Sequence, residues 1–363
     1  MDTSGLVESL ISGYASLALK EKPKTIKASQ LDLAFLQQIG SLADSMYKYQ
    51  VPQDLDRALE SIDLASIYEG VDRREKDAEK EAAKGNVSKL AYEDYIVLEV
   101  LHYFKNSFFT WINKPKCPNC EKDGDNIINK GALRFPTGKP NPKQIMVIEN
   151  YECTDCKREI QFPRINSAVA LLETRSGRCG EWVNCFILIL QAILGPDQQI
   201  RYLWNYEDHV WCEYYSNALN RWVHLDPCEA VADEPLLYCN NWGKQMSWVF
   251  GFGLGYAVDL SSKYIVPEKQ LSQTHKISSK QVVEDYLAAV NFQLQHKYLQ
   301  LIKNTNSQLT EKQLLVKIYQ DVILKRNVES KGLEPKPLPS TSLPKGRQSG
   351  SATWTAERGE AGK

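Results

Sequence analysis

The sequence predicts an α+β fold in which a cysteine at the start of a helix packs against a short antiparallel sheet. Three observations support this prediction. Cys179 follows a small, basic turn and opens an apolar run that stops at Gly195-Pro196, as a helix end would. Segments with alternating side chains come next, near 200–206, 208–215 and 221–227. Two C-x-x-C pairs precede the cysteine, and helical patterns flank this core on both sides.

Length and composition limit the possible classes of protein. The chain has 363 residues, of which 43% are hydrophobic, enough for one large core with additions or for two domains. A net charge of -1 argues against a general nucleic-acid binder. No apolar run suggests a membrane span, and the first residues do not resemble a secretory signal. We therefore expect an intracellular protein whose nine cysteines serve as metal ligands, nucleophile and core residues.

Residues 1–91 are predicted to form an N-terminal helical region. Residues 4–20 make an amphipathic helix that either packs on its own domain or binds a partner. Ser29 begins a capping box for a second helix, and a third is expected from Asp54 to about Ile67. The charged run that ends at Gly85 is expected to be a solvated helix or a less ordered excursion.

Residues 92–277 are predicted to form the main core, with a metal-binding segment at 113–165. Two tight turns each supply a pair of thiolates, and their cysteines are Cys117, Cys120, Cys153 and Cys156. Four sulfurs form a closed tetrahedral set that suits one zinc ion. A redox pair is the alternative for such motifs. Because no coordination position stays open, we expect Zn²⁺ to be structural.

Cys179 is the predicted nucleophile. The positive end of the helix dipole and the neighbouring Arg178 are expected to favour its thiolate. Such a cysteine needs a base and an orienting acid. If Tyr215 faces Asn220 across the hairpin, His209 faces Asp226 at about 5 Å between Cβ atoms.

His224 is the competing base, since the same register places it opposite Trp211. We prefer His209, which begins its strand and should face a cleft. A Cys-His-Asp set, with the nucleophile on a helix and the base on a sheet, indicates a papain-like or transglutaminase-like core that hydrolyses amides. The Cys179 N–H and an indole N–H, from Trp182 or elsewhere, are candidate donors to the oxyanion.

The C-terminal part is predicted to contain helices over 278–328 and a flexible tail over 329–363. Proline, serine, glycine and lysine dominate the tail, a composition typical of disorder. Trp354 is an isolated aromatic residue there that could anchor on a partner.

Several motifs together resemble the cytoplasmic peptide:N-glycanase family of the transglutaminase-like superfamily, in its compact fungal form. They are Gly177-Arg178-Cys179-Gly180-Glu181-Trp182, Asp208-His209-Val210-Trp211-Cys212-Glu213, Arg221-Trp222-Val223-His224-Leu225-Asp226-Pro227-Cys228-Glu229 and the paired cysteine turns. Tail residues 346–351 and 358–360 also look like the ending of fungal members.

The resemblance implies hydrolysis of the amide between N-acetylglucosamine and asparagine in misfolded N-glycoproteins exported from the endoplasmic reticulum for proteasomal degradation. Cys179, His209 and Asp226 match the family's triad, Glu229 matches a substrate-contacting glutamate, and Trp211 lines the same cleft. The implied substrate is a denatured N-glycoprotein or glycopeptide. The implied partner of the terminal helices is a proteasome-shuttle ubiquitin receptor, and the implied locations are the cytoplasm and also the nucleus.

Other functions remain open at this point. A transglutaminase or a cysteine protease could use the same core and triad. A non-catalytic transglutaminase-like scaffold would not need the three residues, all of which are present. A zinc interaction module would leave Cys179, His209 and Asp226 unexplained.

Overall fold

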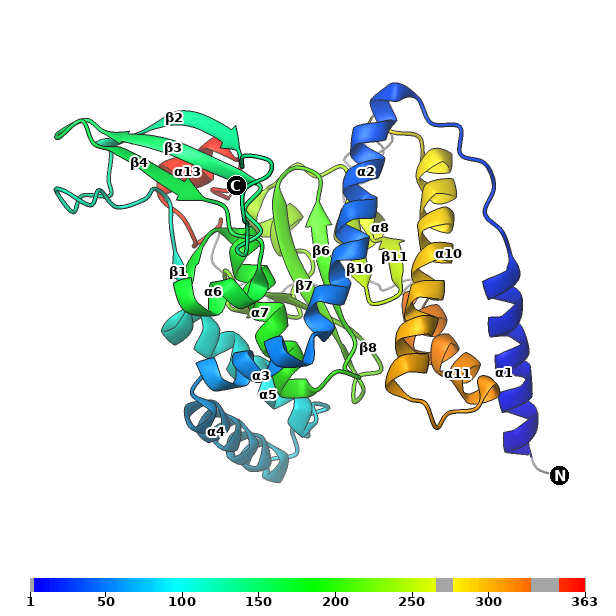
Figure 1. Ribbon diagram of the computed structural model, residues 1–363. Coiled ribbons are helices and arrows are strands. Elements are labelled where there is room, and N and C mark those ends of the chain that lie inside the picture. Colours follow the sequence, from blue (N-terminus) through cyan, green and yellow to red (C-terminus); the bar gives the residue numbers. More distant parts are fainter. Residues whose placement is uncertain (1–2, 266–276, 328–345, 363) are drawn as a thin grey trace.

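A computed structural model describes residues 3–265, 277–327 and 346–362. A six-stranded sheet lies at its centre, in the order β11-β10-β6-β7-β8-β9, with every neighbouring pair antiparallel (Figure 1). Its strands are β6 (Ile200–Asn205), β7 (His209–Ser216), β8 (Arg221–Asp226), β9 (Val231–Ala232), β10 (Val249–Gly253) and β11 (Tyr256–Asp259). The mixed helix-and-sheet class predicted from the sequence is confirmed.

Helix α7 (Cys179–Leu194) packs against β6 and β7 and forms the middle of the main hydrophobic core. Every side chain from Glu181 to Gln191 is buried, because α3 (Pro52–Ser61) and α5 (Tyr92–Tyr103) cover the helix on the sides that the sheet leaves free. This explains why the run is apolar all round rather than amphipathic. Gly195 ends the helix at φ 90°, a backbone conformation that favours glycine.

Helices make up the N-terminal part of the chain. They are α1 (Thr3–Lys20), α2 (Gln30–Ser45), a 3₁₀ turn (Met46–Gln50), α3 (Pro52–Ser61), α4 (Leu64–Ala83) and α5 (Tyr92–Tyr103). The predicted capping box of Ser29 is present, with the Asp32 carboxylate accepting from the Ser29 N–H at 2.9 Å. The charged run continues α4 as an exposed helix, and Gly85 follows its end.

The single helix predicted from Asp54 to Ile67 is instead two helices. Asp63 interrupts it, because its carboxylate accepts the backbone N–H of Ser66 at 3.1 Å and caps α4. The apolar spacing continues across this break, so periodicity alone did not indicate it.

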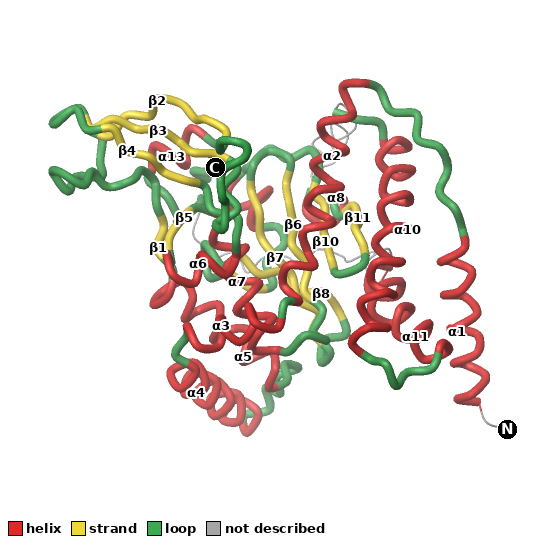
Figure 2. Tube along the Cα trace, in the orientation of Figure 1, coloured by secondary structure: helices red, strands yellow, loops and turns green. Residues whose placement is uncertain are grey.

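The cysteine turns belong to a separate three-stranded antiparallel sheet, β2 (Ile127–Arg134), β3 (Val147–Cys153) and β4 (Glu159–Pro163), which stands at one end of the molecule (Figure 2). Two short parallel strands, β1 (Thr110–Trp111) and β5 (Ser176–Gly177), join its base to the turn that carries Cys179. Helix α6 (Ala168–Thr174) connects the two parts along the chain.

Helices α10 (Lys280–Thr305) and α11 (Glu311–Ile318) pack next to α1, on the side of the molecule away from the three-stranded sheet (Figure 1). The remaining elements are three π-helical turns (Phe104–Phe108, Leu237–Trp242 and Tyr319–Leu324), α8 (Ser261–Tyr264), α12 (Lys325–Asn327) and α13 (Ala352–Glu357). None of the helices in the described ranges combines the length and the apolar character needed to cross a membrane.

The C-terminal end differs from the flexible tail that its composition predicted. Part of that range lies outside the described residues, but residues 346–362 fold against the core, next to the three-stranded sheet (Figure 1). The side chains of Arg347 and Glu360 are buried there. Trp354 packs on Trp111 of the same chain, with ring centroids 5.4 Å apart. Composition did not predict this order, because a few ion pairs and aromatic contacts, rather than an apolar run, hold the segment in place.

Candidate active site and metal centre

Cys179 is the first residue of α7 and is 8% exposed. A buried carboxylate holds the turn before it: the Arg178 N–H donates to Glu181 Oε2 at 3.1 Å. Arg164 then donates to both oxygens of Glu181, at 2.7 and 2.9 Å. Glu181 therefore joins the start of the helix to the end of the three-stranded sheet, and it fixes the position of the sulfur.

The charge environment of Cys179 differs from the prediction. Arg178 points away and donates to Glu149 on β3, at 2.8 and 2.9 Å. Burial raises the pKa of the Cys179 thiol, while the positive charge of Arg347 opposes this shift. At neutral pH the sulfur is therefore a thiol that needs a base, rather than the free thiolate predicted from the turn.

His209 begins β7 and is completely buried. Its Nε2 donates to Asp226 Oδ2 at 3.0 Å. Burial lowers the pKa of His209 well below its ordinary value, and the charge of Arg347 adds to this effect. The imidazole is thus neutral, and Nδ1 carries the lone pair. Within the described part of the chain, no group hydrogen-bonds to Nδ1, so this nitrogen is available to accept a proton.

The hairpin register that led to this pair was wrong by two residues. Tyr215 faces Trp222 and Glu213 faces His224, so His209 does not lie directly opposite Asp226. The last pair before the loop is Ser216 with Arg221, instead of the predicted pair of Tyr215 with Asn220. The loop is therefore displaced by one residue along the chain. A shift of two residues keeps every side chain on its predicted face of the sheet. His209 and Asp226 therefore still meet, along a diagonal.

A tyrosine that the sequence did not single out completes this network. The Tyr238 hydroxyl donates to Asp226 Oδ2 at 3.0 Å. His224 Nδ1 accepts from the Glu234 N–H, so its Nε2 carries the proton and donates to the Tyr238 oxygen at 2.8 Å. His224 therefore supports Asp226 through Tyr238 and is not a competing base. Tyr238 lies in a π-helical turn, and no local sequence pattern marks it.

The two predicted substrate contacts are both buried. Trp211 is fully buried, with its ring stacked on His209 at a centroid distance of 5.6 Å. It therefore lies behind the histidine instead of lining an open surface. Glu229 accepts the backbone N–H groups of Gln348 and Ser349 at 2.8 and 3.0 Å. Its carboxylate thus holds the C-terminal segment in this structure.

One predicted oxyanion donor is occupied. The Trp182 indole N–H donates to the Gly177 carbonyl at 3.2 Å, which leaves the Cys179 N–H as the remaining named candidate. The Trp242 ring lies 5.1 Å from that of His209, and its indole N–H has no partner among the described residues. Trp242 is the second residue here that sequence reasoning missed.

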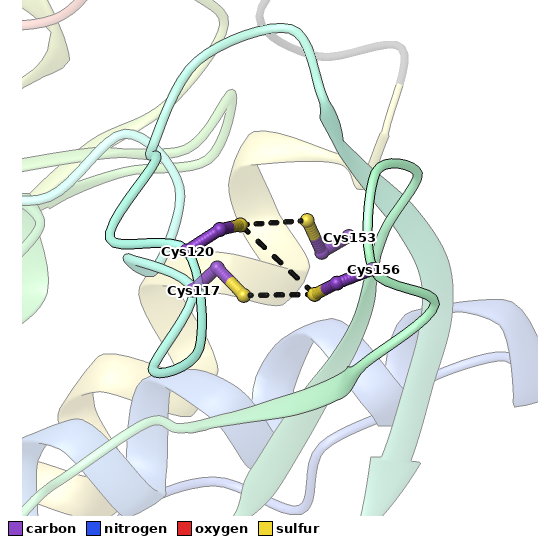
Figure 3. Close-up of side chains that lie close together, drawn as sticks. All are labelled: Cys117, Cys120, Cys153 and Cys156. Atoms are coloured by element: carbon purple, nitrogen blue, oxygen red, sulfur yellow. Dashed lines mark hydrogen bonds between the residues drawn. The ribbon is translucent and has the colours of Figure 1, made fainter.

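The four cysteines of the paired turns form one cluster, as predicted (Figure 3). All four sulfurs lie within 4.8 Å of one another, and three pairs are 3.3, 3.5 and 3.9 Å apart. A tetrahedral metal with sulfur ligands at about 2.3 Å requires sulfur separations near 3.8 Å, so the residues fit such an ion. Backbone N–H groups within the turns lower the pKa of Cys117 and bring that of Cys153 to about 6. Hydrogen bonds with the neighbouring sulfurs, that of Cys153 first, raise the pKa of Cys120, and the pKa of Cys156 is raised as well, so in the metal-free cluster two cysteines favour the thiolate and two the thiol.

Comparison with known proteins places this geometry in a family. Residues 136–227 match the transglutaminase-like superfamily, and residues 205–316 match the Rad4 transglutaminase-like domain. The peptide-N(4)-(N-acetyl-beta-glucosaminyl)asparagine amidase of Debaryomyces hansenii is 49% identical over 334 residues, which cover 91% of this chain and 87% of that protein. The Candida albicans protein of the same name is 43% identical over all of this chain and 97% of its own length.

The human protein of that name is 32% identical and covers 94% of this chain, but the match spans only 48% of the human protein. The Candida albicans match spans the whole chain, so the aligned region includes the cysteine turns, the Cys179 helix and the sheet that carries His209 and Asp226. This chain therefore belongs to the peptide-N(4)-(N-acetyl-beta-glucosaminyl)asparagine amidase family and has its transglutaminase-like fold.

Proposed function

We propose that the chain hydrolyses the amide between N-acetylglucosamine and asparagine in denatured N-glycoproteins, with Cys179, His209 and Asp226 as its catalytic triad. The observation that carries this proposal is the His209–Asp226 hydrogen bond of 3.0 Å, on a strand packed against the Cys179 helix. This bond leaves His209 Nδ1 unpartnered among the described residues and ready to accept the thiol proton. The names of the relatives supply the substrate.

The chemistry follows from the protonation states. His209 Nδ1 removes the proton of the Cys179 thiol, and the sulfur attacks the side-chain amide carbon of the glycosylated asparagine. His209 then gives this proton to the leaving nitrogen, so that a glycosylamine departs and a thioester remains. Water, deprotonated by His209, hydrolyses the thioester. The peptide keeps an aspartate, and the released glycosylamine loses ammonia in water.

Asp226 holds the imidazole in the required tautomer. Its Oδ1 accepts the backbone N–H of Cys228 at 2.9 Å, while its Oδ2 accepts from His209 and from Tyr238. These bonds fix the carboxylate in place, so it stabilises the imidazolium that forms in each proton transfer.

The test is incubation with a denatured N-glycoprotein, followed by mass spectrometry of the glycosylated site. We expect wild type to release the glycan and to convert the asparagine to aspartate, and Cys179→Ala to do neither. Cys239→Ala, which alters a buried cysteine outside the triad and the metal cluster, is the matched control. Glycan release by Cys179→Ala would refute the nucleophile.

The same incubation distinguishes the two enzymatic alternatives. Cleavage of the peptide chain would indicate a protease, and incorporation of an added primary amine at glutamine would indicate a transglutaminase. Either product without glycan release would overturn the proposed reaction.

We further propose that the four-cysteine cluster holds one structural Zn²⁺. Cys117, Cys120, Cys153 and Cys156 would fill all four positions of a tetrahedral ion, which leaves none for substrate. The ion would fix the two turns and thereby support β3, whose Glu149 holds Arg178 beside the nucleophile.

A partner at the N-terminal helix is also part of this proposal. One face of α1 buries Ala15 and Leu19 against the C-terminal helices. The other presents five large apolar side chains that are 52–68% exposed: Leu6, Val7, Leu10, Tyr14 and Leu17. An apolar helix face of this kind suits docking by another protein. We propose that a proteasome-shuttle ubiquitin receptor binds there.

Such a partner would place the enzyme where proteins exported from the endoplasmic reticulum are degraded. We therefore propose the cytoplasm as its location, with the nucleus as a second one. Imaging of the tagged full-length chain tests this, and accumulation inside a secretory compartment would contradict it.

A further inference from the structure

Residues 346–362, called here the C-terminal segment, form a compact loop beside the catalytic residues: the loop bonds to Glu229, three residues after Asp226, and to Asp208, next to His209. The two ends of the loop are tied together, because the Arg347 N–H donates to the Glu360 carbonyl at 2.8 Å. Gly346 has φ 77°, and a Cβ there would lie 2.3 Å from the Ala361 carbonyl oxygen. The sequence of the segment is therefore fitted to this closed shape.

The C-terminal segment is attached to both sides of the site. On the side of the three-stranded sheet, the Ser351 N–H donates to Asn113 at 3.0 Å. On the other side, the buried Lys244 donates to Glu360 at 2.6 Å. Glu229 accepts two backbone N–H groups between these points. The C-terminal segment is therefore attached at three places around the site.

Arg347 is the residue that the C-terminal segment brings into the site. Its side chain is completely buried, and its guanidinium lies 4.8 Å from the ring of Trp111 and 5.2 Å from that of Trp242. Trp242 packs on His209, while Trp111 packs on Trp182, in the first turn of the Cys179 helix. The positive charge of Arg347 therefore lies between Trp242, which packs on the base His209, and Trp111, which packs on the helix of the nucleophile Cys179.

The hydrogen bonds of Arg347 are incomplete. Nη1 donates to Glu360 at 2.8 Å and Nε donates to Ser349 at 2.9 Å. Nη2 is buried, and no described group accepts from it. An unsatisfied buried guanidinium N–H is costly unless negative charge develops near it.

We propose that Arg347 is a positioning residue for the reaction at Cys179, because its buried charge stabilises the negative charge that the sulfur acquires when His209 takes its proton. This inference rests on the proposed function for the identity of the nucleophile. Both Arg347 and Arg178 are paired with a carboxylate, Glu360 and Glu149 respectively, but Arg347 is the cation with the largest effect on the Cys179 thiol, the role predicted from the sequence for Arg178.

The electrostatics of the site agree with this role. After burial, Arg347 is the largest influence on the pKa of Cys179 and lowers it. Burial opposes the charge of Arg347 itself, but Cys179 and Glu360 outweigh it and raise the pKa of the guanidinium. The other charges that act on the thiol come from three places: Asp208 before β7, Arg164 after β4, and Arg358 in the C-terminal segment. Asp208 and Arg358 form an ion pair with each other.

The test measures the ionisation of Cys179 directly. Iodoacetamide alkylation of this residue in the full chain is followed by mass spectrometry across the pH range. Arg347→Met keeps much of the length and the apolar contacts with the tryptophans but removes the charge. Arg347→Gln is a second uncharged variant that retains a donor for Glu360, in case the first does not fold. Arg347→Lys keeps the charge.

We expect the alkylation midpoint to rise by about one pH unit or more in either uncharged variant, which corresponds to roughly tenfold slower alkylation at neutral pH. Arg347→Lys should stay close to wild type. Arg57→Gln, which removes a half-exposed arginine paired with Glu173, controls for the change in net charge. If Arg347 merely held the loop in place, its loss would expose the thiol, and the midpoint would fall.

A midpoint that falls or does not move in a folded uncharged variant would overturn the proposal. Glycan release is measured in parallel, and we expect kcat to fall by at least about tenfold with little change in KM. Because alkylation needs no substrate, it tests Arg347 even if wild type releases no glycan, an outcome that would refute only the proposed function.

Discussion

At the scale of single residues, the site depends on hydrogen bonds that fix protonation states. Asp226 receives His209 and Tyr238 on the same oxygen, and Tyr238 is oriented in turn by His224. Two buried histidines in the described part of the chain, His209 and His224, thus have different tasks. His209 has a nitrogen that no described group occupies, whereas both nitrogens of His224 are engaged. The hydrogen bonds of the ring nitrogens, rather than position in the sequence, therefore distinguish the base His209 from the supporting His224.

Tyr238→Phe tests this support. The change removes one hydrogen-bond donor to Asp226, so we expect kcat for glycan release to fall about tenfold with KM nearly unchanged, the size expected for the loss of one such bond. Tyr264→Phe is the matched control, because that hydroxyl donates to Glu213 instead. Equal losses in both variants would show that Tyr238 acts only through packing.

His224 makes stability depend on pH. Burial lowers the pKa of His224 to about 4, whereas an unfolded histidine titrates near 6.5. Between these values the unfolded chain binds the proton and the folded chain does not, so the free energy of unfolding falls as pH falls. We expect a loss of about 2 kcal/mol between pH 7 and pH 5 from this residue alone. Urea unfolding at both pH values measures it.

His209 contributes to the same acid loss, because its pKa is also lowered. His224→Gln should therefore reduce the dependence on pH without abolishing it. His102→Gln, at an exposed histidine, serves as the control and should leave it unchanged. An undiminished dependence in His224→Gln would contradict the assignment of a neutral buried imidazole.

At the scale of elements, the three-stranded sheet supports the active site through β3. Glu149 on that strand accepts from both Arg164 and Arg178, and these arginines hold the turn that carries Cys179. The short parallel pairing of β1 with β5 adds backbone hydrogen bonds at the same place. The hydrophobic cluster of this sheet is small. Apart from cysteines, its buried members among the described residues are Ile127, Tyr151 and Ile160. We therefore expect so small a core to depend on a bound metal for its stability.

Removal of the metal should therefore unfold this sheet and disturb the nucleophile. We expect a chelator to lower or abolish the melting transition of the β2–β4 unit and to release about one zinc per chain, measured by calorimetry and by elemental analysis. Cys120→Ser should lose the metal, whereas Cys239→Ser, outside the cluster, should retain it. An unchanged melting transition in metal-free protein would argue against a structural ion.

At the scale of the whole molecule, helix α1 and the C-terminal segment lie on different sides of the structure. Helix α1 packs on α11 at the outer edge and exposes an apolar face, far along the chain from the catalytic turn (Figure 1). The C-terminal segment reaches the opposite side and lies beside the site. We therefore expect that the proposed partner-binding face and the proposed catalytic site can be altered separately.

Leu10→Glu tests that separation. Leu10 is 66% exposed, so we expect the variant to melt and to release glycan like wild type, but to bind the ubiquitin receptor at least about tenfold more weakly, measured by calorimetric titration. Ser9→Glu adds the same charge at an exposed polar position of α1 and should bind normally. Normal binding by Leu10→Glu would remove this face from the proposed interface.

The sequence by itself determined the fold class, the cysteine cluster, the helix that begins at Cys179 and the shared sheet face of His209 and Asp226. These features follow from local spacing: period two on strands, apolar runs on helices, and paired ligands on tight turns. A register error of two residues did no harm, because it preserved the face.

Only the tertiary structure decided which groups surround the sulfur. Tyr238, Trp242 and Arg347 reach the site from a π-helical turn and from the far end of the chain, with no local pattern to mark them. In the structure Trp211 is also buried, and Glu229 accepts a hydrogen bond from the C-terminal segment. Charges and hydrogen bonds act across space rather than along the chain, so the protonation states of Cys179 and His209 became known only once distant segments were brought together.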